Sequence, residues 1–143
     1  MEKVLRKVFV TLFILTAGNY AFAGNDGAES SSFNWNPVME AIIEVESEGN
    51  PGAVSGNSCG AMQITPIMVN ECNNILKKRK SKKRYRLADR FNVAKSKEMF
   101  VLFQSYYNPK NNVEKAIRSW NGGLRYSVKG TQRYFNKVMK LLK

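Results

Sequence analysis

The chain has 143 residues, with 23 Lys and Arg against 11 Asp and Glu, so its formal net charge at pH 7 is +12. It has no histidine and two cysteines, which excludes His-based catalytic triads, HExxH zinc sites and closed structural zinc sites. It also lacks a phosphate-binding loop of the Walker A or GxGxxG type. Carboxylates therefore remain as the groups for acid–base chemistry, and we expect neither a cofactor nor a bound metal.

The first 23 residues are typical of a secretory signal peptide. A positively charged start precedes an apolar stretch over residues 8–17, and Ala21-Phe22-Ala23 forms an A-x-A cleavage site. The apolar stretch is short for a membrane span, although an uncleaved N-terminal anchor stays open as the alternative. We therefore expect export by a Sec-type route to the periplasm, the cell envelope or the exterior. Residues 24–35 are expected to be a flexible tail, and residues 36–143 a single folded domain.

A helix is expected to begin at Asn36-Pro37, because Asn can cap a helix and Pro fits its first position. At about 100° per residue the apolar side chains form one arc, made of Val38, Met39, Ile42, Ile43 and Val45. Glu46 falls near the middle of this arc, and Gly49-Asn50-Pro51-Gly52 ends the helix. Burial raises the pKa of a carboxyl and lets it act as a general acid, so Glu46 is the candidate catalytic group. The alternative is a helix-end Glu whose carboxylate reaches water.

Four more helices are expected downstream, all with apolar residues at helical spacing. One begins at Thr65-Pro66, and the next runs from Asp89 until Asn108-Pro109 stops it. Another extends from Asn112 to Gly122-Gly123, and the last begins near Thr131. The apolar face of this last helix consists of Tyr134, Val138, Leu141 and Leu142. No alternating strand of convincing length is present, so the sequence predicts an all-α domain of about five helices.

Residues 77–86 (KKRKSKKRYR) contain eight basic side chains. Such a run repels itself and is commonly a solvated loop or helix end. The functional alternative is a contact with an anionic partner, such as envelope polymer, membrane headgroups or nucleic acid.

Cys59 and Cys72 are the only cysteines, and an exported protein could join them in a disulfide. In the chain-entropy model the closed loop would contribute roughly 3 kcal/mol of stability. Two free, buried thiols are the alternative, because a sequence does not give the Cα separation that a bridge needs.

Four sequence blocks stand out between Ala41 and Val138. They are Glu46 to Ser55 with Gly60 to Pro66, Asp89 to Asn92, Ser119 to Gly123, and Thr131 to Val138. In order and composition they resemble the motifs of the soluble-transglycosylase type of lytic transglycosylase (glycoside hydrolase family 23). Trp120 stands where that family usually has Tyr, and Ala61 where it has Leu or another apolar residue. The resemblance implies a lysozyme-like, all-α catalytic domain with a Gly-rich active-site loop.

The resemblance also implies a reaction. Glu46 would protonate the oxygen between N-acetylmuramic acid and N-acetylglucosamine in peptidoglycan. It would then deprotonate the 6-hydroxyl of the muramic acid, which attacks C1 and leaves a 1,6-anhydro product. The sugar supplies the nucleophile, so the second carboxylate of most glycosidases is not required. The matching positions expected to bind substrate or brace the acid are Ser47, Met62, Gln63, Asn121 and Tyr134.

Each of these positions has a structural alternative. Ser47, expected near the carboxyl or the substrate, could instead bond its own helix backbone. Met62 and Gln63 are expected in the cleft lining, with the Gln63 amide available to N-acetyl and hydroxyl groups. Asn121 is expected beside the sugar, or else is an ordinary helix-end residue. Tyr134 is expected to place its hydroxyl near the acid, or else is a core tyrosine with a satisfied hydroxyl.

Three other functions stay open from the sequence. One is a lysozyme-type muramidase using the same site, and another is a non-catalytic module that binds cell wall or polyanions through residues 77–86. The third is a membrane-active cationic protein. With the family resemblance, the expected partners are peptidoglycan glycan strands and an envelope-spanning secretion or conjugation apparatus of a bacterium. The basic run would then contact anionic envelope polymer, and no nucleic-acid partner is expected.

Overall fold

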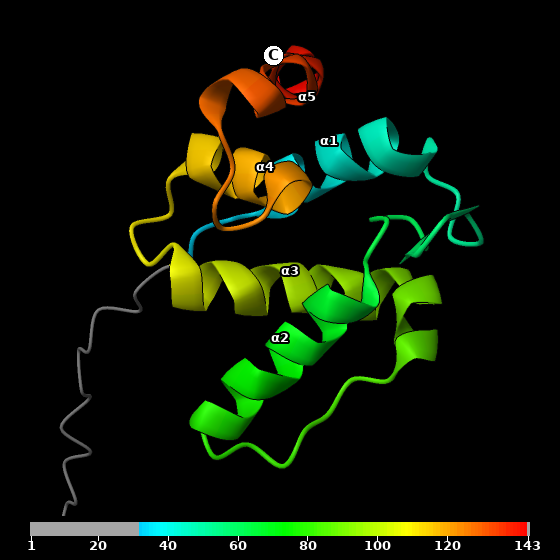
Figure 1. Ribbon diagram of the computed structural model, residues 1–143, viewed down its shortest axis with the longest axis vertical. Helices are drawn as coiled ribbons and strands as arrows, with labels where there is room; N and C mark the ends of the chain where they lie inside the picture. Colours follow the sequence, from blue (N-terminus) through cyan, green and yellow to red (C-terminus); the bar gives the residue numbers. More distant parts are fainter. Residues whose placement is uncertain (1–31, 143) are drawn as a thin grey trace, which may run out of the picture. The chain divides into compact units, whose positions relative to one another are not determined.

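A computed structural model describes residues 32–142, and most of this part of the chain is helical (Figure 1). Its elements are α1 (Asn36–Ser47), β1 (Val54–Ser55), β2 (Ser58–Cys59), α2 (Pro66–Lys78), a 3-10 helix η1 (Leu87–Phe91), α3 (Val93–Tyr107), α4 (Val113–Gly122) and α5 (Val128–Leu141). The prediction of an all-α domain of about five helices is confirmed. The expected signal peptide and most of the expected tail lie outside the described residues. Within the described residues, no helix has the length and apolar character to cross a membrane.

The helices pack in layers around α3 (Figure 1). α2 packs on one side of α3, and α1 and α4 lie on the other, with α5 against both of them. The fully buried side chains come from all of these layers and include Ile42, Met62, Phe100, Ile117 and Val138. The Phe100 ring lies between two tryptophans, with its centroid 5.5 Å from that of Trp35 and 5.1 Å from that of Trp120. Each such side chain contributes about 1.5–3 kcal/mol by leaving water.

The helix starts follow the local sequence, with three corrections. The helix expected from Asp89 is divided, because Asp89 belongs to η1 and α3 begins only at Val93, where Asn92 Oδ1 caps it by accepting from the Lys95 N–H at 2.9 Å. Thr65 caps α2 as predicted, because its Oγ1 accepts a hydrogen bond from the Met68 N–H at 3.2 Å. Asn36 does not cap α1 but is its first residue, and its N–H donates to Asn34 Oδ1 at 3.1 Å. α5 begins at Val128, one turn before the expected start, and Ser127 is its cap. Gly130 lies in this first turn, and because glycine disfavours helices the sequence does not predict a helix there.

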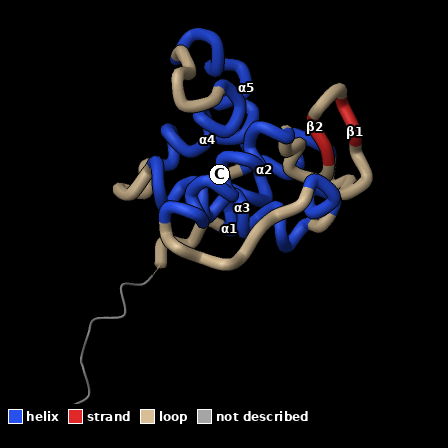
Figure 2. Tube along the Cα trace, turned by 60° about the horizontal axis from the view of Figure 1, so that its bottom comes forward, coloured by secondary structure: helices blue, strands red, loops and turns tan. Residues whose placement is uncertain are grey.

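Two further expectations fail in the structure. Leu141, expected on the apolar face of α5, is 51% exposed because it lies in the last turn, where it lines an open pocket beside Ala41 of α1. The short antiparallel hairpin of β1 and β2 was not expected, since two-residue strands leave no alternating pattern. Figure 2 shows this hairpin at the edge of the helical body.

The two cysteines are both buried and both free in the structure, which matches the alternative of two thiols and not a disulfide. Cys59 ends β2, whereas Cys72 lies in α2 and its Sγ donates to the Met99 carbonyl oxygen at 3.5 Å. Burial, with a smaller contribution from the neighbouring Glu71 carboxylate, raises the pKa of Cys72 to about 12. This thiol is therefore unreactive at neutral pH.

Candidate active site

Glu46 projects from the last turn of α1, next to a sharp change in chain direction. It lies four residues after the fully buried Ile42, so both side chains share the inner face of the helix. α1 ends at Ser47, its C-cap Glu48 has a left-handed backbone (φ 51°), and Gly49 follows with φ 80°. The chain therefore turns into the glycine-rich loop directly beside the Glu46 side chain, which is half-buried as the helical pattern predicted.

Tyr134 of α5 lies against this carboxyl, and its hydroxyl donates to Glu46 Oε1 at 2.7 Å. Burial raises the pKa of Glu46 above its ordinary value, while the hydrogen bond from Tyr134 acts in the opposite direction. Burial and the neighbouring carboxylate also raise the pKa of Tyr134, so the phenol keeps its proton and remains a donor. The pair is thus a partly desolvated carboxyl with a raised pKa and a fixed donor on one oxygen, which is the direction of shift that a general acid needs.

Ser47 secures the glycine-rich loop to the end of α1. Its Oγ lies 2.8 Å from the Ala61 carbonyl oxygen and 3.2 Å from the Ile43 carbonyl oxygen, and a hydroxyl has one proton to donate to them. This arrangement matches the alternative of a helix-end hydroxyl bonded to its own backbone, with a bond to the loop added. Ser47 thereby fixes the loop relative to Glu46.

Gly60 sets the position of that loop by allowing two backbones to touch. A Cβ atom placed on Gly60 would lie 1.8 Å from the Arg90 carbonyl oxygen, and Gly60 has φ +77°. Gln63 closes the loop, because its Nε2 donates to the Gly60 carbonyl oxygen at 2.9 Å and to the Ala53 carbonyl oxygen at 3.3 Å. The expected donor group of Gln63 is therefore used within the loop.

Met62 does not line an open cleft, contrary to expectation. Its side chain is 0% exposed and belongs to the hydrophobic core. The carbonyl oxygen of Met62 accepts a hydrogen bond from Trp120 Nε1 at 3.2 Å, which joins the loop to α4. Through this indole N–H, Trp120 holds the end of α4 against the loop.

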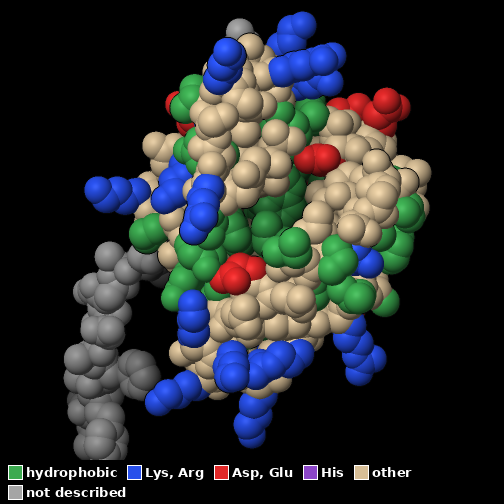
Figure 3. All heavy atoms as spheres, viewed as in Figure 1, with side chains coloured by type: hydrophobic (Ala, Val, Ile, Leu, Met, Phe, Trp, Pro, Cys, Tyr) green, Lys and Arg blue, Asp and Glu red, His purple; other side chains and the backbone are tan. Residues whose placement is uncertain are grey.

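Asn121, the next residue of α4, is exposed and lines a pocket of about 510 Å³. The other lining residues are Thr65, Ile67, Met68, Glu71, Phe103, Tyr107, Ser119, Trp120, Gly122, Gly123, Leu124 and Arg125. Figure 3 shows this face of the molecule hollowed, with a hydrophobic floor and acidic side chains at its edge. An apolar hollow with a few polar groups is the ordinary form of a ligand site.

Sequence reasoning missed Glu71 and Tyr107 in this pocket. The Tyr107 hydroxyl donates to Glu71 Oε1, and this bond, with some burial, raises the pKa of Tyr107 to about 12. Glu71 lies three residues after Met68 on α2, so the helical period could have indicated that it shares a face with an apolar neighbour. No pattern in the sequence links it to Tyr107, which is 36 positions away.

Arg118 of α4 fixes the helix that carries Tyr134. Its guanidinium is buried and donates to the Val128 carbonyl oxygen and Thr131 Oγ1, both at 3.1 Å, and to Gln132 Oε1 at 2.9 Å. These three acceptors all lie in the first turns of α5. The orientation of the Tyr134 hydroxyl therefore depends on a buried polar network that spans two helices.

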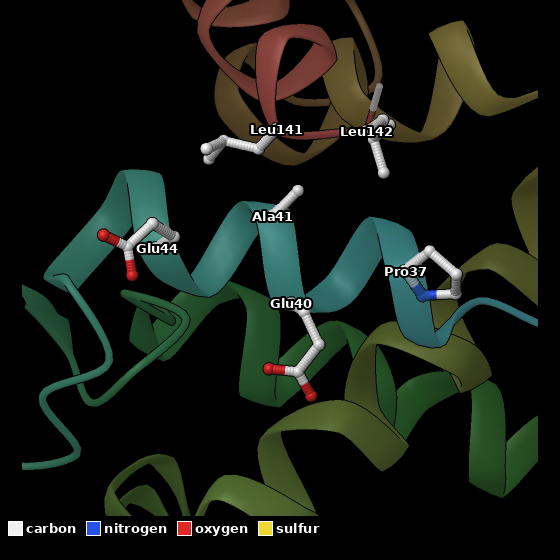
Figure 4. A pocket seen from close by; sticks show the side chains of 6 residues that line it. All are labelled: Pro37, Glu40, Ala41, Glu44, Leu141 and Leu142. Atoms are coloured by element: carbon white, nitrogen blue, oxygen red, sulfur yellow. The ribbon is translucent and has the colours of Figure 1, made fainter.

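A second pocket, of about 360 Å³, lies between α1 and the end of α5 (Figure 4). The Ala41 side chain points toward α5, which carries Leu141 and Leu142, whereas Glu40 and Glu44 point away from α5 (Figure 4). This pocket contains neither Glu46 nor Tyr134, and we assign it no part in the chemistry.

One of three comparisons with known proteins identifies the family of this chain. The family model for the transglycosylase SLT domain matches residues 25–141, which is most of the chain. A comparison with curated proteins found no match, and a comparison with solved structures also found none. The chain therefore belongs to the SLT transglycosylase family, the lysozyme-like lytic transglycosylases that act on peptidoglycan.

Proposed function

We propose that this protein cleaves the β-1,4 bond between N-acetylmuramic acid and N-acetylglucosamine without water, as in glycoside hydrolase family 23, with Glu46 as its single acid and base. The observation that carries the proposal is the half-buried Glu46 carboxyl, with its raised pKa, bonded at 2.7 Å to Tyr134. It lies beside the glycine-rich loop of an SLT transglycosylase domain.

In the first step protonated Glu46 gives its proton to the bridging oxygen, and the bond from that oxygen to C1 of the muramic acid breaks. The electron pair leaves with the N-acetylglucosamine oxygen, and the 2-acetamido group of the muramic acid stabilises the positive charge. In the second step the Glu46 carboxylate takes the proton of the muramic acid 6-hydroxyl, whose oxygen attacks C1. The products are a 1,6-anhydro end and a free hydroxyl, and Glu46 is protonated again. Proton transfer of this kind contributes about 10²- to 10⁴-fold to a rate.

The surrounding residues have supporting roles in this proposal. Tyr134 stabilises the carboxylate that forms after the proton leaves, and Ser47 and Gln63 hold the loop through the bonds described above. Asn121 offers its amide to the glycan in the adjacent pocket. The reaction needs no metal or cofactor, because the acid is a side chain and the nucleophile belongs to the sugar.

Hydrolysis is the second candidate, and Glu71 is the observation that favours it. A lysozyme-type muramidase needs a second carboxylate to activate water or to attack the sugar, and Glu71 lines the pocket beside Asn121. However, Glu71 Oε1 already accepts a hydrogen bond from the Tyr107 hydroxyl, which favours a structural role for Glu71 over a role as catalytic base.

Product analysis separates the two reactions. We would digest purified peptidoglycan in water enriched in the heavy oxygen isotope and identify the ends by mass spectrometry. The proposal predicts anhydro ends without heavy oxygen, and it predicts that Glu71→Gln leaves these products unchanged. Reducing ends that carry heavy oxygen would show hydrolysis, and their loss in Glu71→Gln would identify the second carboxylate.

We also propose the setting of this activity. Residues 1–23 would direct a bacterial protein to the periplasm, the cell envelope or the exterior, and residues 24–32 would be a flexible tail. The tail was expected to reach residue 35, but Trp35 is 5% exposed and belongs to the hydrophobic core, so the catalytic domain would begin at Phe33. A small exported enzyme of this family would open the wall locally for an envelope-spanning secretion or conjugation apparatus. Cleavage of the chain after Ala23 in an exporting bacterium, read by N-terminal sequencing, tests the first part.

A further inference from the structure

The basic run, residues 77–86, is fixed to the fold and does not form a loose loop. Its one aromatic residue, Tyr85, is 6% exposed, and the Tyr85 hydroxyl donates to Glu98 Oε2 at 3.2 Å. The Asn73 side chain binds the Tyr85 backbone on both sides, as donor to its carbonyl oxygen at 2.9 Å and as acceptor from its N–H at 2.8 Å. The Ser81 N–H donates to the Leu76 carbonyl oxygen at 2.9 Å. The structure therefore presents these cations on an ordered backbone.

Most of the cations on this run point to solvent. Lys83 pairs with Glu98, and the Arg84 guanidinium turns back to donate to the Ser81 and Lys83 carbonyl oxygens. The other six basic side chains are exposed, and they are Lys77, Lys78, Arg79, Lys80, Lys82 and Arg86. Two nearby acids are already occupied, since Glu98 binds Lys83 and Asp89 binds Lys95. Figure 3 shows one group of Lys and Arg side chains at the bottom of the view, where Figure 1 places the end of α2 and the chain that follows it, and another group at the top.

Apolar side chains lie directly beside these cations. A shallow pocket of about 520 Å³ has Val101 and Leu102 of α3 among its lining residues, together with Arg79, Lys83, Lys97 and Glu98. Lys83 is paired with Glu98 and Lys97 with Glu40, so Arg79 is the cation of this pocket without an ion pair within the described residues. The partly exposed Tyr106 ring lies under the Lys78 ammonium, 4.9 Å from the ring centroid. Val101 is also partly exposed, and half-exposed Leu87 follows the run directly. The surface thus combines ordered positive charge with an apolar and aromatic area.

The combination of these features identifies the chemistry of a partner. A linear anionic polymer would neutralise the lysines but would leave Val101, Leu102 and the Tyr106 ring in water. An anionic bilayer meets both needs, because lipid phosphates lie at the level of the cations while aromatic and aliphatic side chains enter the headgroup region. We propose that residues 77–86, together with the exposed side of α3 from Lys97 to Tyr106, dock this protein on an anionic phospholipid membrane. The proposal is independent of glycan cleavage.

The test measures how the full chain binds phospholipid vesicles. Flotation with vesicles of phosphatidylcholine containing phosphatidylglycerol would be compared with phosphatidylcholine alone. One variant carries Lys77→Gln, Lys78→Gln, Lys80→Gln and Lys82→Gln, and the matched control carries Lys129→Gln, Arg133→Gln, Lys137→Gln and Lys140→Gln on α5. Both lose four charges, and the control side chains are exposed and make no hydrogen bond or ion pair within the described residues.

We expect the run variant to bind anionic vesicles about 10²- to 10³-fold more weakly than the unchanged chain, and the control to stay within a few-fold. Raising the salt from about 0.1 M to about 1 M should release the unchanged chain, because the screening length falls from about 10 Å to about 3 Å. Val101→Ser should weaken vesicle binding about three- to tenfold without changing the binding of soluble polyglutamate. Both quadruple variants should cleave peptidoglycan as the unchanged chain does, so failure here is distinct from failure of the proposed reaction.

Three results would overturn the proposal. An equal loss of vesicle binding in the run variant and in the control variant would show that net charge alone attracts the protein to lipid. Equal binding to neutral and anionic vesicles would assign binding to the apolar N-terminal segment, which all variants share. Tight binding of soluble polyglutamate without vesicle binding would identify a polymer site in place of a membrane site.

Discussion

Replacing Tyr134 by Phe removes one hydroxyl from the site and keeps the ring that packs in α5. The lost hydrogen bond is 2.7 Å long and its acceptor is a half-buried carboxyl. A hydrogen bond to a charged group contributes about 1.5–3 kcal/mol. In the proposed reaction Glu46 becomes charged as it gives up its proton, so this stabilisation would be greater in the transition state than before it. Its loss should lower kcat about ten- to a hundredfold.

The same substitution has a second, independent consequence. The Tyr134 hydroxyl is the group that lowers the pKa of Glu46 against burial, so its removal should raise that pKa further. The alkaline limb of the rate profile, which requires protonated Glu46, should therefore move to higher pH. The assay is release of soluble muropeptides from peptidoglycan as a function of pH, with Tyr126→Phe as control. The Tyr126 hydroxyl makes no hydrogen bond within the described residues, so that variant should behave as the unchanged protein. A Tyr134→Phe enzyme with unchanged kcat and an unchanged alkaline limb would refute the reasoning.

Three further predictions concern stability. Gly60→Ala should cost at least about 2 kcal/mol in urea unfolding, because the new Cβ meets the Arg90 carbonyl oxygen and φ is +77°; full stability would contradict this close contact. Arg118→Met should cost about 2–4 kcal/mol and reduce activity with it, since three acceptors on α5 lose their donor; an unchanged unfolding midpoint would show that the network is dispensable. Glu46→Gln should raise the melting temperature above neutral pH. The pKa of Glu46 is higher in the folded state than in the unfolded state. The folded state is therefore favoured at a pH below the unfolded-state pKa, and this stability is lost as the pH rises through the folded-state pKa. The melting temperatures of variant and wild type should converge as the pH falls, and a gap that widens toward acid would contradict the sign.

The helical period alone placed Glu46, the proposed acid, on the inner face of its helix. Apolar spacing in residues 38–45 predicted the inner face of α1 and placed Glu46 on it, and the structure agrees. The partner on α5 could not come from periodicity, because Tyr134 is 88 positions away and the contact depends on how α5 packs. The expectation that Tyr134 lies near Glu46 came from the resemblance to a family, because members of one family share a tertiary arrangement.

The loop shows where sequence reasoning ends. The identities of Ser47, Met62 and Gln63 indicate which side chains can form hydrogen bonds and which can be buried. They do not indicate which partner each side chain contacts. Ser47 and Gln63 find backbone carbonyl oxygens within or beside the loop, and Met62 enters the core. These outcomes follow from the close approach of Gly60 to the Arg90 backbone, a contact between segments 30 positions apart that no local pattern encodes.

The measurement that tests the account most directly is the digestion of purified peptidoglycan by the Glu46→Gln protein, with Glu44→Gln as the matched control. Glu44 lies on the same helix but points to solvent, so its substitution should leave the rate and the anhydro products unchanged. If Glu46 is the single acid and base, Glu46→Gln should remain folded and lose about 10²- to 10⁴-fold or more of the activity, with no anhydro ends above background. Anhydro products from Glu46→Gln at a rate near that of the control would contradict the central claim.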